Sequence, residues 1–379
     1  MMGNEFKNEI KNIEGKKYDK YDMEKKAQLS FTKDDEYIQE SLKEMLKDLE
    51  EVKKYFNKYI PKFFENFELL DFLDSGGESN IYTVIPICKR QNEKNLRRKV
   101  IMKVILNNNQ KENNKEYWIS YKLKNQNIIN NYGYSPIKKN ESSMILMDDA
   151  KYGSIRNFVK NILKRKTLSE SFISYLAYQI LNSIKYIHKC NVAHMDIKLQ
   201  NIVIDEYLTT KLIDFSISIN YKDKKQNDSI ELPCKGTIFY MPKEVLESKK
   251  IKIKHLQKVD LYSLGVLLYK LAFGCYPYGL SYGDEENFEV ILQKIKEGKL
   301  EYNNNNNKKA YSSYFLDFLT KLLEKDINKR INIKDAEKHY WIQGANILLD
   351  EKEQYYNLEK FTCYLLTDNF KIFNDYIHN

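Results

Sequence analysis

The chain has 379 residues, 42% of them hydrophobic and 30% charged, which is enough for a globular body with a sizeable buried core, plus extensions. The formal net charge of +9 includes no compact Lys/Arg block, so we expect no nucleic-acid surface. The N-terminus carries no apolar signal, and the longest apolar stretch, Leu261 to Phe273, is too short to span a bilayer. Five scattered cysteines without a C-x-x-C pair favour the cytoplasm, with the nucleus as the other reducing compartment.

Residues 1–65 are highly charged and contain a helical pattern from Asp34 to Tyr59, in which apolar residues recur every three or four positions. Pro61 ends this pattern. Because a helix with one apolar stripe needs a surface to cover it, we expect this helix to pack on the body of the protein. A docking or dimerising helix is the alternative.

The next segment predicts two strands joined by a glycine turn at Gly76 and Gly77, with Ile81 in the second strand. Backbone N–H groups in such a turn can bind phosphate where no side chain blocks the approach, and a simple hairpin turn is the alternative. Farther along, residues 100–105 predict a buried strand that contains one lysine, Lys103. A lysine in an apolar strand needs a partner, and a lysine that reaches water from an edge strand is the alternative.

Residues 144–147 predict another buried strand, and apolar periodicity from Ser169 to His188 predicts a long buried helix. Helices predominate from there to the end of the chain. A low-complexity asparagine run occupies 303–307, and a charged, aromatic-rich tail follows Gln343.

Two carboxylates, a lysine and a carboxamide lie close together after the long helix. Asp196 is able to accept a proton, and Lys198 is able to neutralise a phosphoryl oxygen. Asn201 and Asp214 offer oxygen ligands to a hard cation. Any one of these residues alone is more typical of a solvated turn. The combination favours phosphoryl transfer.

These residues also carry a family resemblance. The run 194–201 resembles the H-R-D-L-K-x-x-N motif of eukaryotic protein kinases, and Asp214-Phe215 lies where the family has D-F-G. Residues 236–244 resemble the G-T-x-x-Y-x-A-P-E motif, residues 260–265 the D-x-W-S-x-G start of a helix, and residues 326–330 the D-P-x-x-R motif. In the family, the last Glu and Arg of these motifs form a buried ion pair, which predicts pairing of Glu244 with Arg330.

The resemblance implies an α+β fold, the bilobal protein kinase fold, with a small β-rich N-lobe and a larger helical C-lobe. We expect an N-terminal extension at 1–65, the N-lobe at 66–147, the C-lobe at 148–343 and a tail at 344–379. The match is divergent, since only the middle glycine of the family's G-x-G-x-x-G loop is present and Met195 replaces the usual Arg before the catalytic Asp.

The resemblance further implies binding of ATP and Mg²⁺, or Mn²⁺ in its place, in the cleft between the lobes. Asp196 is then the catalytic base, Lys198 stabilises the transferred phosphoryl group, and Asn201 and Asp214 hold the metal. Lys103 positions the α- and β-phosphates, braced by Glu116 or, as the second choice, Glu112. The other nucleotide-binding positions are Gly76 and Gly77 in the glycine loop, Ile81, Ile101 and Val203 around the adenine, Met147 as gatekeeper, and the backbone of Asp148 and Ala150.

Lys198 resembles the serine/threonine pattern, so we expect a serine/threonine protein kinase with a protein substrate. Met195 removes the charge that normally receives an activation-loop phosphate, which predicts constitutive or partner-driven activity. Ser154, Gln200 and Lys270 stand where kinases that prefer Arg-rich substrates carry acidic residues, which disfavours such substrates.

Two alternatives remain at this point. A pseudokinase that binds nucleotide or partners without catalysis is favoured by the departures from the motifs, which are Asp74, Ser79, Ile101, Met195 and Ser216. A small-molecule kinase of the aminoglycoside or choline type shares the H-x-D-x-x-x-x-N loop, but Glu244, Asp260 and Arg330 favour a protein substrate.

Overall fold

The computed structural model describes residues 67–75, 79–86, 99–105, 110–138, 142–162, 168–232, 235–284, 287–302 and 311–345. The chain divides into two compact units, residues 1–110 with 133–147 and residues 111–132 with 148–379. The predicted N-terminal helix, Gly76 and Gly77, the asparagine run at 303–307 and the tail from residue 346 on lie outside the described residues.

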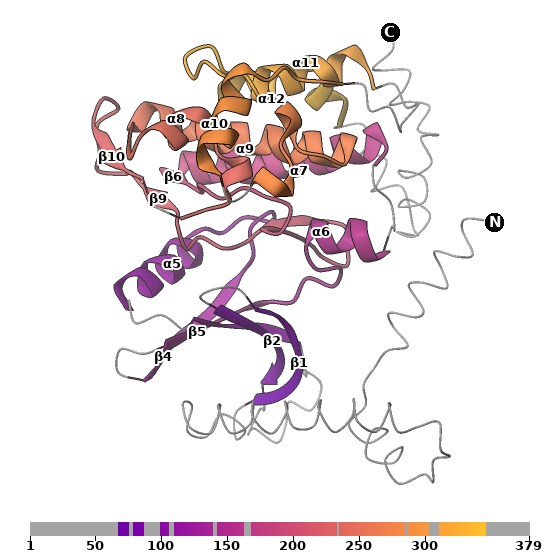
Figure 1. Cartoon of the computed structure of the whole chain (residues 1–379). Helices are drawn as coiled ribbons and strands as arrows, with labels where there is room; N and C mark the ends of the chain where they lie inside the picture. Colours follow the sequence, from indigo (N-terminus) through magenta and orange to yellow (C-terminus); the bar gives the residue numbers. More distant parts are fainter. Residues whose placement is uncertain are drawn as a thin grey trace, which may run out of the picture. The chain divides into compact units, whose positions relative to one another are not determined.

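A five-stranded sheet dominates the first unit, with the strand order β1-β2-β3-β5-β4 (Figure 1). Its strands are β1 (Phe67–Ser75), β2 (Ser79–Pro86), β3 (Val100–Ile105), β4 (Asn131–Lys138) and β5 (Ser142–Asp148). Successive residues of a strand point to opposite faces, and every second residue of β3 packs against β2 in one apolar cluster. Lys103 belongs to the alternate set and pairs with Ile81 across the ladder. The predicted strands are confirmed.

Helices make up most of the second unit. They are α5 (Gln110–Lys122), α6 (Ile155–Asn157), α7 (Glu170–Lys189), α8 (Lys243–Glu247), α9 (Ile253–Phe273), α10 (Phe288–Glu297), α11 (Ser313–Leu322) and α12 (Ile333–Glu337). Short π or 3-10 turns are η2 (Phe158–Ile162), η3 (Ile238–Tyr240), η4 (Pro277–Gly279) and η5 (Tyr282–Asp284). The division places α5 in this unit, whereas the sequence analysis assigned it to the N-lobe.

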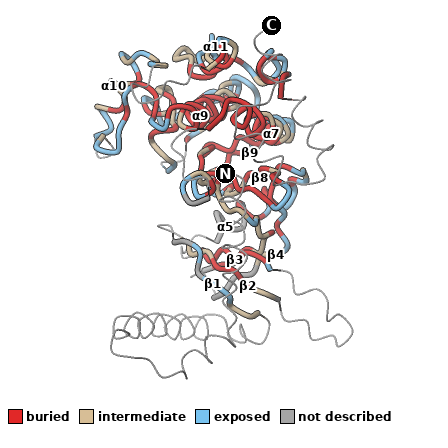
Figure 2. The backbone as a smooth tube through the Cα atoms, turned by 90° about the vertical axis from the view of Figure 1, so that its right-hand side faces the viewer, coloured by how far each residue is buried: buried red, intermediate tan, exposed pale blue. Residues whose placement is uncertain are grey.

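Helices α7 and α9 form the buried centre of the second unit, and Figure 2 shows α9 buried along most of its length. Helix α7 begins after Ser169, whose hydroxyl accepts a hydrogen bond from the Phe172 amide, so the predicted helix is confirmed. Helix α9 ends at Gly274, which has a φ of 74°. A Cβ at Gly265 would lie 2.9 Å from that of Leu322, so glycine lets α9 approach α11 closely.

One boundary differs from the sequence analysis. Asp260 does not start a helix, because α9 already begins at Ile253. Ile253, Leu256 and Val259 are all buried, and their spacing of three residues continues the apolar face of the helix toward its N-terminus. Asp260 is therefore an interior helical residue. In the described part of the chain, no helix is both long and apolar enough to cross a membrane.

Short antiparallel strand pairs position the loops of the second unit. They are β6 (Val192–Ala193) with β9 (Ile219–Asn220), β7 (Ile202–Ile204) with β8 (Thr210–Leu212), and β10 (Ser229–Glu231) with β11 (Lys250–Lys252). The loop between β6 and β7 carries Asp196 and Asn201, and Asp214 directly follows the β8 region. Backbone pairing therefore brings the polar residues of both segments to one place.

Candidate active site

One buried carboxylate, that of Asp260, binds the first residues of the β6–β7 loop. Asp260 Oδ2 accepts hydrogen bonds from the His194 amide at 2.9 Å and from His188 Nε2 at 2.7 Å, and Oδ1 accepts one from the Met195 amide at 2.8 Å. Burial alone would raise the pKa of Asp260, but the hydrogen bond and charge of His188 hold that pKa below its usual value. His188 Nδ1 is buried without a hydrogen-bond partner.

The Asp196 carboxylate accepts hydrogen bonds from three groups. Asn201 Nδ2 lies 2.9 Å from Oδ2, Lys198 Nζ lies 2.6 Å from the same oxygen, and the Thr237 amide donates to Oδ1 at 3.2 Å. Asn201 Nδ2 also donates to the Asp196 carbonyl at 2.9 Å. The side chain is therefore fixed in one orientation while it remains 9% exposed.

Thr237 links the loop to the segment that follows residue 235. Its hydroxyl accepts a hydrogen bond of 2.8 Å from Lys198 Nζ. The neighbouring Gly236 has a φ of 127°, and a Cβ there would lie 2.7 Å from Met241 Cε. A glycine is thus required for the Thr237 amide to reach Asp196. Sequence reasoning placed Thr237 in a motif but gave it no role, because its partners lie about forty residues earlier in the chain.

Asn201 and Asp214 offer the oxygen ligands that suit Mg²⁺. The Ile213 amide donates to the Asn201 carbonyl at 3.0 Å, so Asp214 follows directly after a residue that is paired with Asn201. Because Asn201 Nδ2 binds Asp196, its Oδ1 is the side-chain atom left for a cation. The described residues contain no group of three or more His, Cys, Asp or Glu that could hold a metal. One carboxylate and one amide oxygen fit Mg²⁺, which usually keeps several waters and binds substrate phosphates.

Two features of the second motif bear on its departure from D-F-G. Asp214 adopts a φ of 65°, and the Ser216 amide donates to its Oδ1 in a long bond of 3.4 Å. Ser216 itself is not among the described residues with a positive φ. The serine that replaces the family's glycine therefore causes no backbone strain.

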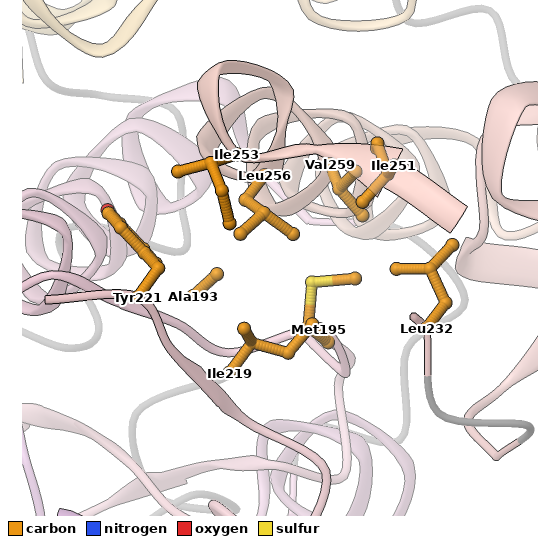
Figure 3. Packing of buried hydrophobic residues seen from close by; sticks show 9 residues of the cluster. All are labelled: Ala193, Met195, Ile219, Tyr221, Leu232, Ile251, Ile253, Leu256 and Val259. Carbon is orange, nitrogen blue, oxygen red and sulfur yellow. The ribbon is translucent and has the colours of Figure 1, made fainter. Parts of the chain in front are cut away.

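Met195 points away from the polar residues of the loop. It adopts a φ of 70° and is 7% exposed. Figure 3 shows its side chain packed among eight other buried residues, which are Ala193, Ile219, Tyr221, Leu232, Ile251, Ile253, Leu256 and Val259. We call these nine residues the Met195 cluster. The position that carries Arg in most of the family thus carries an apolar side chain here, and this side chain packs against other apolar residues.

The predicted pair of Glu244 and Arg330 is confirmed. Arg330 Nη1 lies 2.6 Å from Glu244 Oε1, and Nη2 lies 3.3 Å from Oε2. The Arg330 side chain is fully buried and also donates to the carbonyls of Glu324 and Lys258. This guanidinium ties α8 to α9 and to the segment before α12.

The structure describes the other residues that were predicted to contact the nucleotide, and each unit is taken by itself. In the first unit, Lys103 is 8% exposed, Ile101 is 9% exposed, and Ile81, opposite Lys103, and Met147 are half-buried. In the second unit, Val203 is buried on β7, Glu116 is buried on α5 and Ala150 is half-buried. Because Lys103 and Glu116 belong to different units, their pairing stays a prediction, and the Glu112 side chain lies outside the described part.

The strand that precedes Ala150 ends in a hydrogen-bonded aspartate. The Asp148 carboxylate accepts hydrogen bonds from Asn130 Nδ2 at 2.9 Å and from the Tyr132 hydroxyl. The Asp148 amide donates to the Asn130 carbonyl at 3.0 Å. The adenine contacts predicted for the backbone of Asp148 and Ala150 stay predictions.

Comparison with known proteins gives the same family as the motifs. A family model described as protein kinase domain matches residues 68–342. The chain is 29% identical to an Aurora kinase of Eremothecium gossypii over 240 residues, which are 63% of this chain and 59% of that protein. It is 34% identical to calcium-dependent protein kinase 4 of Plasmodium falciparum over 187 residues, 48% of this chain and 32% of the relative.

A third relative is a probable myosin light chain kinase of Dictyostelium discoideum, 27% identical over 285 residues, which are 75% of this chain and 55% of that protein. In these three comparisons the chain thus spans between 32% and 59% of the length of its relatives.

Proposed function

This chain belongs to the protein kinase domain family, and we propose that it transfers the γ-phosphate of ATP to serine and threonine hydroxyls of protein substrates. The observation that carries this proposal is the arrangement around Asp196. Lys198, Asn201 and Thr237 hold its carboxylate in one orientation beside the oxygen ligands of Asn201 and Asp214. A base, a cation and two metal ligands are the parts that phosphoryl transfer needs.

In the proposed reaction, Asp196 accepts the proton of the substrate hydroxyl as that oxygen attacks the γ-phosphorus. Lys198, already within 2.6 Å of Asp196, neutralises charge on the transferred phosphoryl group. Asn201 and Asp214 would hold Mg²⁺, which neutralises phosphate charge when bound. Most of the rate acceleration then comes from alignment and charge stabilisation, since the transfer needs little covalent chemistry from the protein.

Protein kinases generally use ATP and Mg²⁺, and we assign the nucleotide contacts of this chain to both units. Lys103 would hold the α- and β-phosphates, with Glu116 as its proposed partner. Burial of both side chains supports this assignment, since a buried charge needs an opposite charge. Mn²⁺ would be accepted in place of Mg²⁺ because the same oxygen ligands suit it.

The choice of serine and threonine over tyrosine rests on Lys198. Its position two residues after the base resembles the serine/threonine pattern, and the ion pair with Asp196 keeps its charge at the phosphoryl position. The similarity to an Aurora kinase and to a probable myosin light chain kinase supports the same choice. The cytoplasmic location and the docking role of the N-terminal helix stay predictions.

We further propose that the kinase needs no phosphate on residues 217–235. Met195 offers no charge to such a phosphate, and β9 and β10 hold this segment by backbone pairing. The pseudokinase alternative is not favoured, because the structure brings Asp196, Lys198 and Asn201 together, beside Asp214.

Phosphate transfer from radiolabelled ATP with Mg²⁺ to generic protein substrates tests the proposal, followed by identification of the phosphorylated amino acid. The wild type is compared with Asp196→Asn and Asp214→Asn, and with Asp317→Asn as a matched control on α11. We expect transfer to serine and threonine by the wild type and the control, and a loss of about 10²- to 10⁴-fold in the two site variants. Equal transfer by all four proteins would remove the assignment.

A further inference from the structure

Two exposed segments of the second unit are rich in lysine. Residues 222–231 contain three lysines and residues 249–254 contain four, against three acidic residues in the same two ranges. All seven lysines are exposed. We call them the lysine patch, and its members are Lys222, Lys224, Lys225, Lys249, Lys250, Lys252 and Lys254. The two segments together therefore carry an excess of positive charge.

Backbone hydrogen bonds bring the two segments together. In the antiparallel pair of β10 and β11, Lys252 lies opposite Ser229. The Lys254 amide donates to the Gln226 carbonyl at 3.0 Å. The turn at 222–228 therefore lies against the first residues of α9. Figure 1 shows β10 at the edge of the second unit, where its outer side chains meet solvent.

The strand pair separates its apolar residues from its lysines. Ile251 is buried in the Met195 cluster (Figure 3), and Ile230, which lies opposite Ile251, packs against the same cluster. Because successive residues of a strand point to opposite faces, Lys250 and Lys252 point away from the cluster. Lys250 pairs with Glu231 at 3.5 Å, and within the described residues no ion pair involves the other six lysines of the patch.

The patch lies at the end of α9 where positive charge is unfavourable. The peptide dipoles of a helix place a partial positive charge at its N-terminus, which favours anionic side chains there. Helix α9 has no acidic residue in its first turn, and Lys252 is its N-cap residue. Burial lowers the pKa of His255, and the charges of neighbouring lysines, first of all Lys254, lower it further. The stability of α9 therefore does not explain these lysines, whose repulsion an external anion would relieve.

The composition of the patch distinguishes between classes of anionic partner. Residues 222–231 and 249–254 contain no arginine and no aromatic residue. Arginine and aromatic side chains are the usual anchors of protein partners, and aromatic side chains also stack on the bases of single-stranded nucleic acids. An anionic membrane surface needs no such anchor, because its many headgroups attract all nearby lysines at once. The patch thus fits a lipid surface better than a protein or a nucleic acid.

We propose that the lysine patch binds the surface of a membrane that contains anionic lipids. The contact is peripheral, since Ile230 and Ile251 pack inside the protein and do not insert into the lipid. Attraction between exposed charges is screened by salt, so the binding is salt-dependent. This inference is independent of the proposed function, because it concerns where the chain binds and not the transfer of phosphate.

Sedimentation of the full chain with lipid vesicles tests the proposal. One set of vesicles is pure phosphatidylcholine, and the other contains about one third phosphatidylserine, which gives the surface a negative potential. We expect the wild type to sediment with the anionic vesicles at low salt, to be released at high salt, and to remain in solution with pure phosphatidylcholine. No binding to the anionic vesicles, or equal binding to both sets, would overturn the proposal.

Paired variants assign the binding to the patch. Lys252→Gln with Lys254→Gln removes two charges from the patch, and Lys334→Gln with Lys338→Gln removes two charges from exposed positions on and just after α12. We expect the first pair to lower the partition coefficient about tenfold or more, since each lysine near an anionic surface contributes about fivefold. The control pair should bind as the wild type does. Lys252→Arg with Lys254→Arg keeps the charge and should keep the binding.

Three further results would overturn the patch as a lipid-binding surface. Equal losses in the patch variant and the control would show that net charge alone causes the binding. Loss of binding in the arginine variant would show that charge is not the cause. Binding of a DNA duplex that is tighter than binding of the vesicles, and that the patch variant weakens, would identify nucleic acid as the partner. If the patch variant does not fold, Lys224→Gln with Lys225→Gln in the exposed turn decides by the same measurement.

Discussion

The two sides of the β6–β7 loop use opposite physical chemistry. On one side, Asp196, Lys198 and Asn201 form a network of charged and polar groups that accepts and donates hydrogen bonds within 2.9 Å. On the other side, Met195 packs in an apolar cluster. Adjacent residues of one loop thus have two different roles. Directional hydrogen bonds orient Asp196, and non-directional burial of Met195 anchors the loop.

This difference has a consequence for control. A charged anchor can be switched by adding or removing a phosphate, whereas an apolar anchor responds to no such charge. The segment that follows Asp214 is also held by backbone, because the Leu232 amide donates to the Lys249 carbonyl at 2.8 Å and the Ile253 amide donates to the Asp228 carbonyl at 2.9 Å. We therefore expect this segment to be ordered in the protein without phosphate.

Glu244→Gln should produce the largest loss of stability. It tests the buried ion pair of Glu244 with Arg330, for comparison with the apolar packing of Met195. The substitution leaves the fully buried Arg330 guanidinium without its carboxylate partner. We expect the free energy of unfolding to fall by about 3–5 kcal/mol in denaturant titrations. The control is Lys321→Gln, which removes the exposed pair with Asp317 and should cost less than about 1 kcal/mol.

Met195→Arg directly tests the packing of residue 195 in the Met195 cluster. An Arg at this position would place a charge among the buried residues of the Met195 cluster, and we expect a loss of about 3 kcal/mol in the free energy of unfolding. Met195→Leu keeps the volume and should cost less than about 1.5 kcal/mol. If Met195→Arg were as stable as Met195→Leu, the cluster would not be the anchor that we describe.

Low pH should weaken the contribution of Asp260 to stability, which comes from its hydrogen bonds to the start of the β6–β7 loop. Its pKa is lowered in the folded protein, so its contribution to stability is fully present above the unfolded pKa of about 4 and is lost as the pH falls through the folded value. We expect Asp260→Asn to cost about 2 kcal/mol at neutral pH, because an amide replaces the acceptor of three hydrogen bonds. The difference from the wild type should shrink below about pH 4 in thermal unfolding measurements. A difference that stayed constant down to strongly acidic pH would contradict this role.

Thr237→Val should have the smallest effect. It removes the hydroxyl that accepts a hydrogen bond from Lys198 but keeps the amide that donates to Asp196. We expect kcat to fall about fivefold, which corresponds to about 1 kcal/mol. Thr237→Ser keeps the hydroxyl and should retain most of the activity. A larger loss in the serine variant than in the valine variant would show that the hydroxyl is not the relevant group.

The sequence was sufficient where local pattern determines structure. A continuous apolar run predicted β3, helical periodicity predicted α7, and the resemblance to the kinase motifs predicted the pair of Glu244 and Arg330. The motifs also placed the groups around Asp196 in one loop. These features depend on nearby residues or on motifs in a fixed order, so a sequence can reveal them.

Contacts between distant segments could not be predicted. Asp260 was assigned to a helix start, yet its carboxylate holds the amides of His194 and Met195, which lie more than sixty residues earlier. The contacts of Thr237 with Asp196 and Lys198 were missed for the same reason. A local pattern carries no information on which buried polar group meets which partner, because tertiary packing decides this.

The most direct test of the account is the rate of phosphate transfer by the wild type after complete removal of its phosphates, measured beside Asp196→Asn. We predict that the phosphate-free protein transfers phosphate to serine or threonine at the rate of the untreated protein and that Asp196→Asn transfers it about 10²- to 10⁴-fold more slowly. Loss of activity after phosphatase treatment, restored by rephosphorylation within 217–235, would contradict the apolar anchor. Equal transfer by the wild type and Asp196→Asn would contradict the catalytic role of the loop.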